Sequence, residues 1–371
     1  MTATLSNRRP LLPPALAAFK QMGREELAQL IRQFKAELGE KLVILGHHYQ
    51  SDDVIQFADF TGDSFKLAQE AARVKGCQYI VFCGVHFMAE TADILTSPEV
   101  EVILPDIAAG CSMADMADRD SVQNAWEDLD RIVGASDIVP VTYMNSTADL
   151  KAFCGRHGGI VCTSSNARSV LEWAYAQKSR VLFFPDQHLG RNTAKAMGMP
   201  LDEMIVWDPH EELGGNAEAD IAKARIILWK GHCSVHQMFL PEHIDVFRAR
   251  DPEVKILVHP ECRMEVVDKA DLVGSTEGIL KVLREAPSGS HWAVGTELHM
   301  VNRIAASMPD KKIDFLSPMV CLCATMYRID MPHLAWVLDE LRYGRVINRI
   351  SVDADTIHWA RLALERMLAV K

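Results

Sequence analysis

The feature of this 371-residue sequence that most constrains its fold is an α/β unit that occurs three times. Recurrence at a long period means that one supersecondary arrangement is built repeatedly, so the three copies are interpreted together. Each copy opens with an apolar run, typical of a buried strand, that ends in a polar cluster. The three openings are KLVILGHHYQ (41–50), IVPVTYMNST (138–147) and VKILVHPECR (254–263).

Three further signals follow each opening in the same order. A hydroxyl-bearing residue stands at the start of a predicted helix, then one strand ends in a histidine and a last strand ends in a cysteine. The hydroxyls are Ser64, Ser164 and Ser275 with Thr276; the histidines are His86, His188 and His299; the cysteines are Cys111, Cys233 and either Cys321 or Cys323. The larger histidine-to-cysteine spacing in the middle unit predicts an insertion within residues 199–222.

Strands that alternate with helices predict an α/β protein with parallel sheets. Three such units related by a pseudo-threefold axis would direct equivalent strand ends at one centre, and ligands in open α/β sheets bind beyond the carboxyl ends of the strands. The expected domains are an N-terminal segment and helix (1–38), three α/β domains (39–125, 126–240 and 241–330), and C-terminal helices that pack back on the body (331–371).

Charge and hydropathy exclude several classes of function. The net charge of −11 argues against nucleic acid or an anionic membrane as the main partner. No apolar run reaches the roughly 18–20 residues that a membrane span needs. Two prolines interrupt the apolar part of the first 19 residues, which argues against a signal peptide. We therefore expect a cytoplasmic protein.

Nine cysteines occur without a CxxC pair, which disfavours a structural zinc site. Three recurring cysteines are instead one ligand short of a closed tetrahedral site. Thiolates suit iron–sulfur clusters, and three of them would leave one iron of a four-iron cluster open to substrate. Zinc held by three thiolates and three buried, inert thiols are the alternatives. Cys262 is expected to line the site without being a ligand.

The other recurring residues allow a functional and a structural interpretation. Ser64, Ser164 and Thr276 either cap helices or bind a carboxylate or phosphate at helix N-termini. The strand-end residues either satisfy one another or supply general acid–base groups. These are His47, Tyr49, Tyr143, Asn145, His259 and Glu261. Glu261 is the best candidate base, with a pKa that we expect burial to raise.

The remaining histidines fall into two groups. For the recurring His86, His188 and His299 we favour a structural role. His232 and His236 flank Cys233 and either support the site or are solvated.

In order along residues 40–330, the motifs GHHYQ, TGDSFKLA, GVHFMAETA, CSM, YMNSTADLKA, CTSSNA, PDQHLGRN, WKGHCSVH, ILVHPE, VGSTEGI and CLCATM resemble the quinolinate synthases. These are the iron–sulfur enzymes of de novo pyridine nucleotide (NAD) synthesis. The resemblance implies three pseudo-equivalent α/β domains around one [4Fe–4S] cluster. It also implies a condensation of iminosuccinate (iminoaspartate) with dihydroxyacetone phosphate that gives quinolinate, phosphate and water.

The resemblance assigns roles to individual positions. It implies cluster ligation by Cys111, Cys233 and Cys323, and it is the reason for preferring Cys323 to Cys321. The implied substrate-binding residues are His47, Ser64, Tyr143, Asn145, Ser164, His259, Glu261 and Thr276, and Tyr49 is a further catalytic group beside Glu261, His47 and His259. The implied partners are the two small substrates and, functionally, an enzyme that produces iminosuccinate. A hydro-lyase with an open iron and a metal-dependent sensor are the rival functions.

Overall fold

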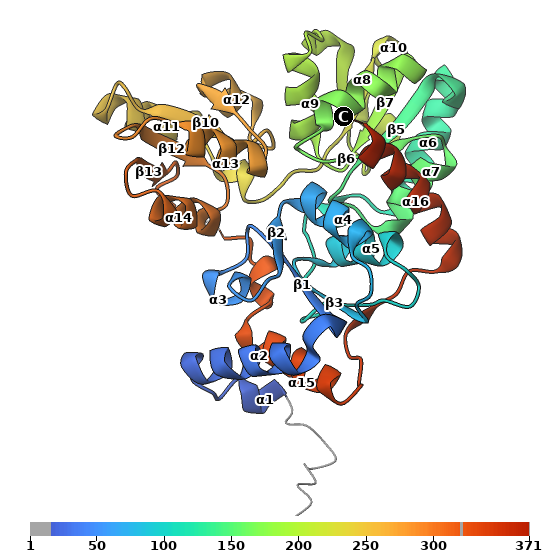
Figure 1. Ribbon diagram of the computed structural model, residues 1–371. Helices are drawn as coiled ribbons and strands as arrows, with labels where there is room; N and C mark the ends of the chain where they lie inside the picture. Colours follow the sequence, from blue (N-terminus) through green and yellow to red (C-terminus); the bar gives the residue numbers. More distant parts are fainter. Residues whose placement is uncertain (1–15, 320–321, 371) are drawn as a thin grey trace, which may run out of the picture.

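The computed structural model describes residues 16–319 and 322–370 and contains three mainly parallel β-sheets (Figure 1). Each sheet contains the three strands that the repeat predicts and one short strand that it does not, β2, β6 or β11, and these four run parallel in the same spatial order: β2-β1-β3-β4, β6-β5-β7-β9 and β11-β10-β12-β13. The predicted α/β class with parallel sheets is therefore confirmed. Central strands such as β1 read as continuous apolar runs because both faces of a parallel sheet are covered.

The first sheet has the order β2-β1-β3-β4, with β14 antiparallel at the β4 edge. Its fifth strand, β14, comes from the C-terminal part of the chain, far from the other four in sequence. The elements are β1 (Leu42–His47), α3 (Asp52–Ile55), β2 (Phe60–Gly62), α4 (Ser64–Arg73), β3 (Tyr79–Cys83), α5 (His86–Leu95), β4 (Glu101–Ile103), η2 (Ala114–Met116) and β14 (Arg349–Ile350).

The second sheet has the order β6-β5-β7-β9-β8. The extra edge strand, β8, lies inside the segment 199–222 that the spacing marks as an insertion. The elements are α6 (Arg119–Val133), η3 (Ala135–Asp137), β5 (Ile138–Tyr143), α7 (Ala148–Arg156), β6 (Ile160–Cys162), α8 (Ala167–Gln177), β7 (Arg180–Phe184), α9 (Gln187–Ala196), η4 (Leu201–Glu203), β8 (Met204–Trp207), η5 (Glu212–Gly215), α10 (Glu218–Lys223), β9 (Ile226–Trp229) and η6 (His236–Met238).

The third sheet has the order β11-β10-β12-β13 and no added strand among the described residues. The elements are α11 (Pro241–Arg250), β10 (Lys255–Val258), α12 (Met264–Lys269), β11 (Leu272–Val273), α13 (Thr276–Glu285), β12 (His291–Gly295), α14 (Leu298–Ser307), β13 (Lys312–Phe315) and η7 (Met326–Arg328).

The hydrophobic cores do not divide evenly among the three sheets. One continuous core joins the first two sheets to the C-terminal helices. The third sheet has two smaller cores of its own, one on each side. The half-buried ring of Tyr49, which follows β1, packs against the large core and also against a core of the third sheet. The third sheet is thus built as a separate packing unit that meets the others near Tyr49.

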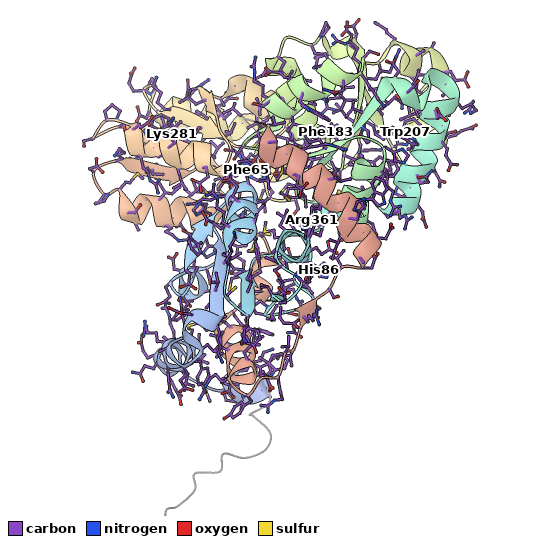
Figure 2. The ribbon with its side chains drawn as sticks, turned by 45° about the vertical axis from the view of Figure 1, so that its right-hand side comes forward. Phe65, His86, Phe183, Trp207, Lys281 and Arg361 are labelled. Atoms are coloured by element: carbon purple, nitrogen blue, oxygen red, sulfur yellow. The ribbon has the colours of Figure 1, made fainter. Side chains whose placement is uncertain are left out.

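The N-terminal and C-terminal helices complete the body. These are α1 (Leu16–Phe19), α2 (Arg24–Leu38) followed by η1 (Gly39–Lys41), α15 (Met331–Arg342) and α16 (Ala354–Ala369). Helix α15 packs on α2, and α16 packs on α7 of the second unit. The α16–α7 approach is close, because a Cβ added at Gly155 would lie 1.9 Å from the carbonyl oxygen of Trp359. Arg361 on α16 also donates to the carbonyl oxygens of Ile94 and Thr96 in the first unit (Figure 2).

None of the helices in the described part of the chain combines the length and the apolar character that crossing a bilayer requires.

Candidate active site

One cavity lies where the three sheets meet. All twelve residues that the sequence singled out as ligands, substrate-binding groups or catalytic groups line it. They are His47, Tyr49, Ser64, Cys111, Tyr143, Asn145, Ser164, Cys233, His259, Glu261, Thr276 and Cys323. Residues separated by up to 276 positions are thus brought together, while the specific role of each stays a prediction.

The three cysteines occupy equivalent loops. Each lies after the last parallel strand of its unit and three residues before a short 3₁₀ helix: η2, η6 or η7. Each carbonyl oxygen accepts a bond from the backbone N–H four residues on, at 3.1 Å for Cys111, 2.9 Å for Cys233 and 3.3 Å for Cys323. This shared local geometry makes Cys323 the counterpart of the other two. Cys321 lies outside the described residues.

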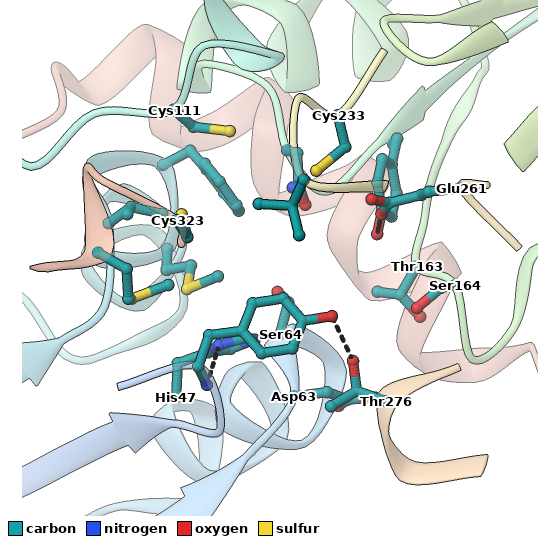
Figure 3. A pocket seen from close by; sticks show the side chains of 18 of the residues that line it. His47, Asp63, Ser64, Cys111, Thr163, Ser164, Cys233, Glu261, Thr276 and Cys323 are labelled. Carbon is teal, nitrogen blue, oxygen red and sulfur yellow. Dashed lines mark hydrogen bonds between the residues drawn. The ribbon is translucent and has the colours of Figure 1, made fainter. Parts of the chain in front are cut away.

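The sulfurs of Cys111, Cys233 and Cys323 point into the cavity from one side, across from Ser64, Ser164 and Thr276 (Figure 3). All three thiols are free and partly buried. Burial raises the pKa of each of them, to about 12 for Cys111, so the thiols are neutral on their own and metal binding must release protons. Three converging soft donors with cavity space beside them fit an iron–sulfur cluster that keeps one iron open.

A second set of donors overlaps the first. Cys233 Sγ, a ring nitrogen of His236 and a carboxylate oxygen of Glu261 lie within 4.8 Å of one another and could hold a single metal ion. The described residues therefore contain a possible metal site of mixed ligands as well as the three-cysteine arrangement. The two share Cys233 but differ in whether Cys111 and Cys323 are needed.

Three helix N-termini meet the cavity opposite the cysteines. Of the hydroxyl residues marked by the sequence, Ser275 caps α13 by accepting from Gly278 N, whereas Asp63, and not Ser64, caps α4 by accepting from Lys66 N. Ser64 and Thr276 are the first residues of those helices, and Ser164 lies three residues before α8. Their hydroxyls are therefore not used for capping and face the cavity.

Positive potential at this end of the cavity comes from the backbone. Free N–H groups and the helix dipole favour an anion at a helix N-terminus. None of the described residues that line the cavity is lysine or arginine. Three converging helix ends therefore suit a small, multiply charged carboxylate or phosphate ligand.

His47 and His259 are held in the same way. The backbone N–H of Tyr49 donates to Nδ1 of His47 (3.1 Å), and the N–H of Glu261 donates to Nδ1 of His259 (3.3 Å). These bonds place the remaining proton on Nε2 of each ring. Burial lowers the pKa of both to about 3, with smaller contributions from neighbouring charges. Both imidazoles are thus neutral hydrogen-bond donors at neutral pH.

Glu261 is a buried carboxylate of the cavity wall with polar side chains close to both of its oxygens. Oε1 accepts from the hydroxyl of Tyr143, and Oε2 lies 2.7 Å from Nδ1 of His236. Burial alone would raise its pKa, but the imidazoles of His236 and His259 and these hydrogen bonds favour the carboxylate more, and the pKa lies below its ordinary value. The expectation of a raised pKa is therefore wrong. The burial was predictable, but the donors come from distant parts of the chain.

Several residues of the site have no assignment from the sequence. Asp63 and Thr163 line the cavity beside Ser64 and Ser164, and Thr296 stands behind Tyr49. His236, for which the sequence left a supporting and a solvated position open, is buried behind Glu261. The motifs TGDS and CTSS contain the first pair, so adjacency was an available signal. No sequence signal marked Thr296. The recurring histidines His86, His188 and His299 do not line this cavity, and neither does the buried Cys262.

Comparison with known proteins gives a consistent assignment. Residues 29–369 match the family model described as "NadA: Quinolinate synthetase A protein". The chain is 56% identical over 367 residues to the quinolinate synthase of Rhodopirellula baltica, covering 96% of this chain and 94% of that protein. It is 59% identical over 351 residues to that of a Nocardioides species, covering 93% and 89% of the two chains. The chain belongs to the quinolinate synthase family.

Proposed function

We propose that this protein is a quinolinate synthase, a transferase that condenses iminosuccinate with dihydroxyacetone phosphate to give quinolinate, phosphate and water in de novo NAD biosynthesis. Family membership supports this proposal. The single structural observation that carries it is one cavity with two opposed halves. Three equivalent cysteine loops form one half, and three helix N-termini with hydroxyls that line the cavity form the other.

The substrate carboxylates and phosphate bind at the helix ends. Ser64, Ser164 and Thr276 each offer a hydroxyl next to free backbone N–H groups, which suits anionic oxygens. Because the cavity wall has no lysine or arginine among its described residues, these groups have to supply the attraction. Tyr143 and Asn145 line the same wall and orient the triose phosphate and the forming ring.

Proton transfer is carried out by other residues of the cavity wall. Glu261 is held as a carboxylate and is the general base, while the Tyr143 hydroxyl that donates to it fixes its orientation. His47 and His259 present Nε2–H groups that stabilise a developing oxyanion on the substrate. Tyr49, a neutral phenol, returns a proton when a hydroxyl departs as water.

The cofactor is a [4Fe–4S] cluster held by Cys111, Cys233 and Cys323. When bound, such a cluster supplies a Lewis-acid iron that polarises a substrate oxygen or nitrogen without net redox change. The three units with their shared strand order are taken as pseudo-threefold domains that place these cysteines around one centre. We place the enzyme in the cytoplasm, with no nucleic-acid or membrane partner, downstream of an enzyme that produces iminosuccinate.

The deciding experiment uses protein purified and assayed without oxygen. The expected result is about four irons and four acid-labile sulfides per chain, with quinolinate formed only when both iminosuccinate and dihydroxyacetone phosphate are present. A hydro-lyase would act on a hydroxy acid without triose phosphate. A sensor would bind metal and form no product.

The possible site of mixed ligands (Cys233, His236 and Glu261) allows a test that distinguishes a single metal ion from a cluster. A single metal at Cys233, His236 and Glu261 would survive Cys111→Ser and Cys323→Ser, because neither residue belongs to that group. Loss of iron and sulfide in all three cysteine variants supports the cluster. Retention of one metal ion per chain in Cys111→Ser would exclude it.

A further inference from the structure

In each unit, the residue four positions after the recurring histidine bonds to a neighbouring unit. Helices α5, α9 and α14 carry these histidines at their first or second position. About one helical turn later lie Glu90, Asn192 and Arg303. Each of these side chains bonds to the backbone just after the first strand of another unit. The contacts run from the first unit to the second, from the second to the third, and from the third back to the first.

Asn192, in the second unit, holds the loop of the third unit that carries Glu261. Its amide nitrogen donates to the carbonyl oxygens of Pro260 and Cys262, both at 2.8 Å. These two residues stand on either side of Glu261 in the chain. Asn192 is 6% exposed and does not line the cavity. An amide nitrogen has two hydrogens, so both are used to fix the backbone around Glu261.

Arg303, in the third unit, holds the loop of the first unit that carries Tyr49. Its guanidinium donates to the carbonyl oxygen of His48 at 2.9 Å and to that of Gln50. These two residues stand on either side of Tyr49. The same guanidinium donates to the carboxylate of Asp52, and such a charged bond fixes its orientation. Arg303 therefore holds the backbone around Tyr49 as Asn192 holds the backbone around Glu261.

The two loops that are held in this way have the same backbone turn. The N–H of Gln50 donates to the carbonyl oxygen of His47, and the N–H of Cys262 donates to that of His259, both at 3.0 Å. In both turns the carbonyls before and after the third residue accept from the neighbouring unit. Two chemically different side chains thus make the same contact at matching positions.

The contact from the first unit to the second has a different form. Glu90 accepts from the backbone N–H of Ala148 at 3.0 Å, three residues after Asn145. The buried ammonium of Lys151 donates to the carbonyl oxygen of Ser146, directly after Asn145. Burial lowers the pKa of Lys151 to about 8, and the nearby carboxylate of Glu90 opposes that shift. The loop that carries Asn145 is therefore held by a carboxylate of the first unit and a lysine of its own.

We propose that Glu90, Asn192 and Arg303 are positioning residues through which each unit aligns the strand-end loop of the next. Asn192 acts through Glu261, and Arg303 acts through Tyr49. The inference rests on the proposed function, because it takes Glu261 and Tyr49 as groups that touch substrate. A reacting group that is misplaced by about 1 Å can lower the rate about a hundredfold.

The alternative is that these contacts only hold the units together. Asn192→Leu separates the two, because leucine is close to asparagine in shape and has no hydrogen-bond donor. The matched control is Lys195→Met on the same helix. It removes another contact with the third unit, the bonds at 2.6 Å from Nζ to both carboxylate oxygens of Asp268. Arg303→Met removes the guanidinium, and Arg303→Lys keeps a positive donor.

Steady-state kinetics of the loaded enzyme, with iron and sulfide content, is the first measurement. Asn192→Leu and Arg303→Met should each lower kcat about a hundredfold. KM for both substrates should stay within about twofold, because substrate binding is not what these contacts serve. Lys195→Met should keep kcat within about twofold, and Arg303→Lys should recover about a tenth or more of it. Normal kcat in Asn192→Leu would overturn the proposal. If that variant does not fold, Asn192→Ala is measured in its place.

Backbone hydrogen exchange gives a readout that does not depend on turnover. Asn192→Leu should speed exchange in residues 259–262 about tenfold or more and leave residues 47–50 unchanged, and Arg303→Met should do the reverse. Lys195→Met should change neither loop. Equal acceleration of both loops in either variant would mean a general loss of stability and would overturn the inference.

The two measurements distinguish this inference from the proposed reaction. Failure of the wild-type enzyme to form quinolinate would reject the reaction. Unchanged exchange of residues 259–262 in Asn192→Leu would reject the positioning role, whatever the enzyme makes.

Discussion

The hydroxyl of Ser165 donates a hydrogen bond to the carboxylate of Asp63 across 2.6 Å, although the two residues are 102 positions apart. Ser165 also lies 3.0 Å from the hydroxyl of Ser275, 110 positions away. Asp63 and Ser275 cap α4 and α13, and Ser165 lies just before α8. One serine therefore ties together the helix ends of all three units.

Loss of the Ser165 hydroxyl should weaken substrate binding and leave the rate of the chemical step nearly unchanged. Ser165→Ala is expected to raise KM about tenfold, while kcat stays within about twofold. A net hydrogen bond to a charged group contributes about 1.5 kcal/mol at the lower end. Steady-state kinetics with each substrate measures this. Ser169→Ala, on α8, is the matched control. A fall in kcat at unchanged KM would contradict the expectation.

Glu261→Gln should nearly abolish turnover. The substitution keeps the size of the side chain but removes the carboxylate that the structure surrounds with donors, so a loss of about a thousandfold is expected. Quinolinate formation and iron content are measured together. Exposed Glu265→Gln, four residues on, should be neutral. Normal turnover in Glu261→Gln would show that another group is the base.

Replacing any one of Cys111, Cys233 or Cys323 with serine should release iron and sulfide from the anaerobic protein. Serine is a poor ligand for iron–sulfur sites, which prefer soft thiolates. No fourth cysteine among the described residues lines the cavity, so none can replace a lost ligand. Cys83→Ser, in β3 and fully buried away from the cavity, is the control and should keep its cluster. Iron retained in Cys323→Ser but lost in Cys321→Ser would reverse the assignment of the third ligand.

Stability should fall on acidification partly because of His47. Its pKa is about 3 in the folded protein and near 6.5 when unfolded, so between these values the unfolded chain binds a proton that the native state does not. Stability from this group is full above pH 6.5 and is lost toward pH 3, by at most about 1.4 kcal/mol per pH unit.

Denaturant unfolding of wild type and His47→Gln between pH 4 and pH 7 measures the effect. The variant should lose less stability on acidification than the wild type. His358→Gln, on the exposed face of α16, should leave the slope unchanged. Identical slopes for wild type and His47→Gln would mean that His47 is protonated in the native state.

Gly155→Ala should destabilise the protein strongly. The added Cβ would lie 1.9 Å from the carbonyl oxygen of Trp359, so α16 would have to move away from α7. A loss of about 3 kcal/mol, at the upper end for overpacking, is expected in thermal or denaturant unfolding. Gly23→Ala is the control, because nothing lies within 4 Å of the added atom.

Much of the site was predictable because the same weak sequence signals occur in all three α/β units. A single cysteine after a strand, such as Cys233, says little, but three in equivalent positions predicted a common centre. The α/β class and the parallel sheets followed from apolar runs alternating with helical patterns. The extra strand β8 appeared only as a spacing anomaly, since its own residues, Met204–Trp207, make a short apolar run with no functional mark.

The part that could not be predicted depends on contacts between units. The pKa of Glu261 is lowered because His236 and Tyr143 approach from the second unit, and no local pattern records that approach. Thr296 is an ordinary threonine after a strand until the fold places it between two rings. The hydroxyls of Ser64 and Thr276 matched the pattern of helix caps, but their neighbours Asp63 and Ser275 do the capping.

The path of the C-terminal part of the chain affects how the protein can fold while it is being translated. Strand β14 completes the first sheet and α16 covers the second, yet both are made after the whole third unit. Domains generally fold as units during synthesis, and the third unit has cores of its own. The core of the third unit can therefore form without the C-terminal segment. The first unit still lacks an edge strand, and α7 of the second lacks the helix that covers it, until that segment emerges from the ribosome.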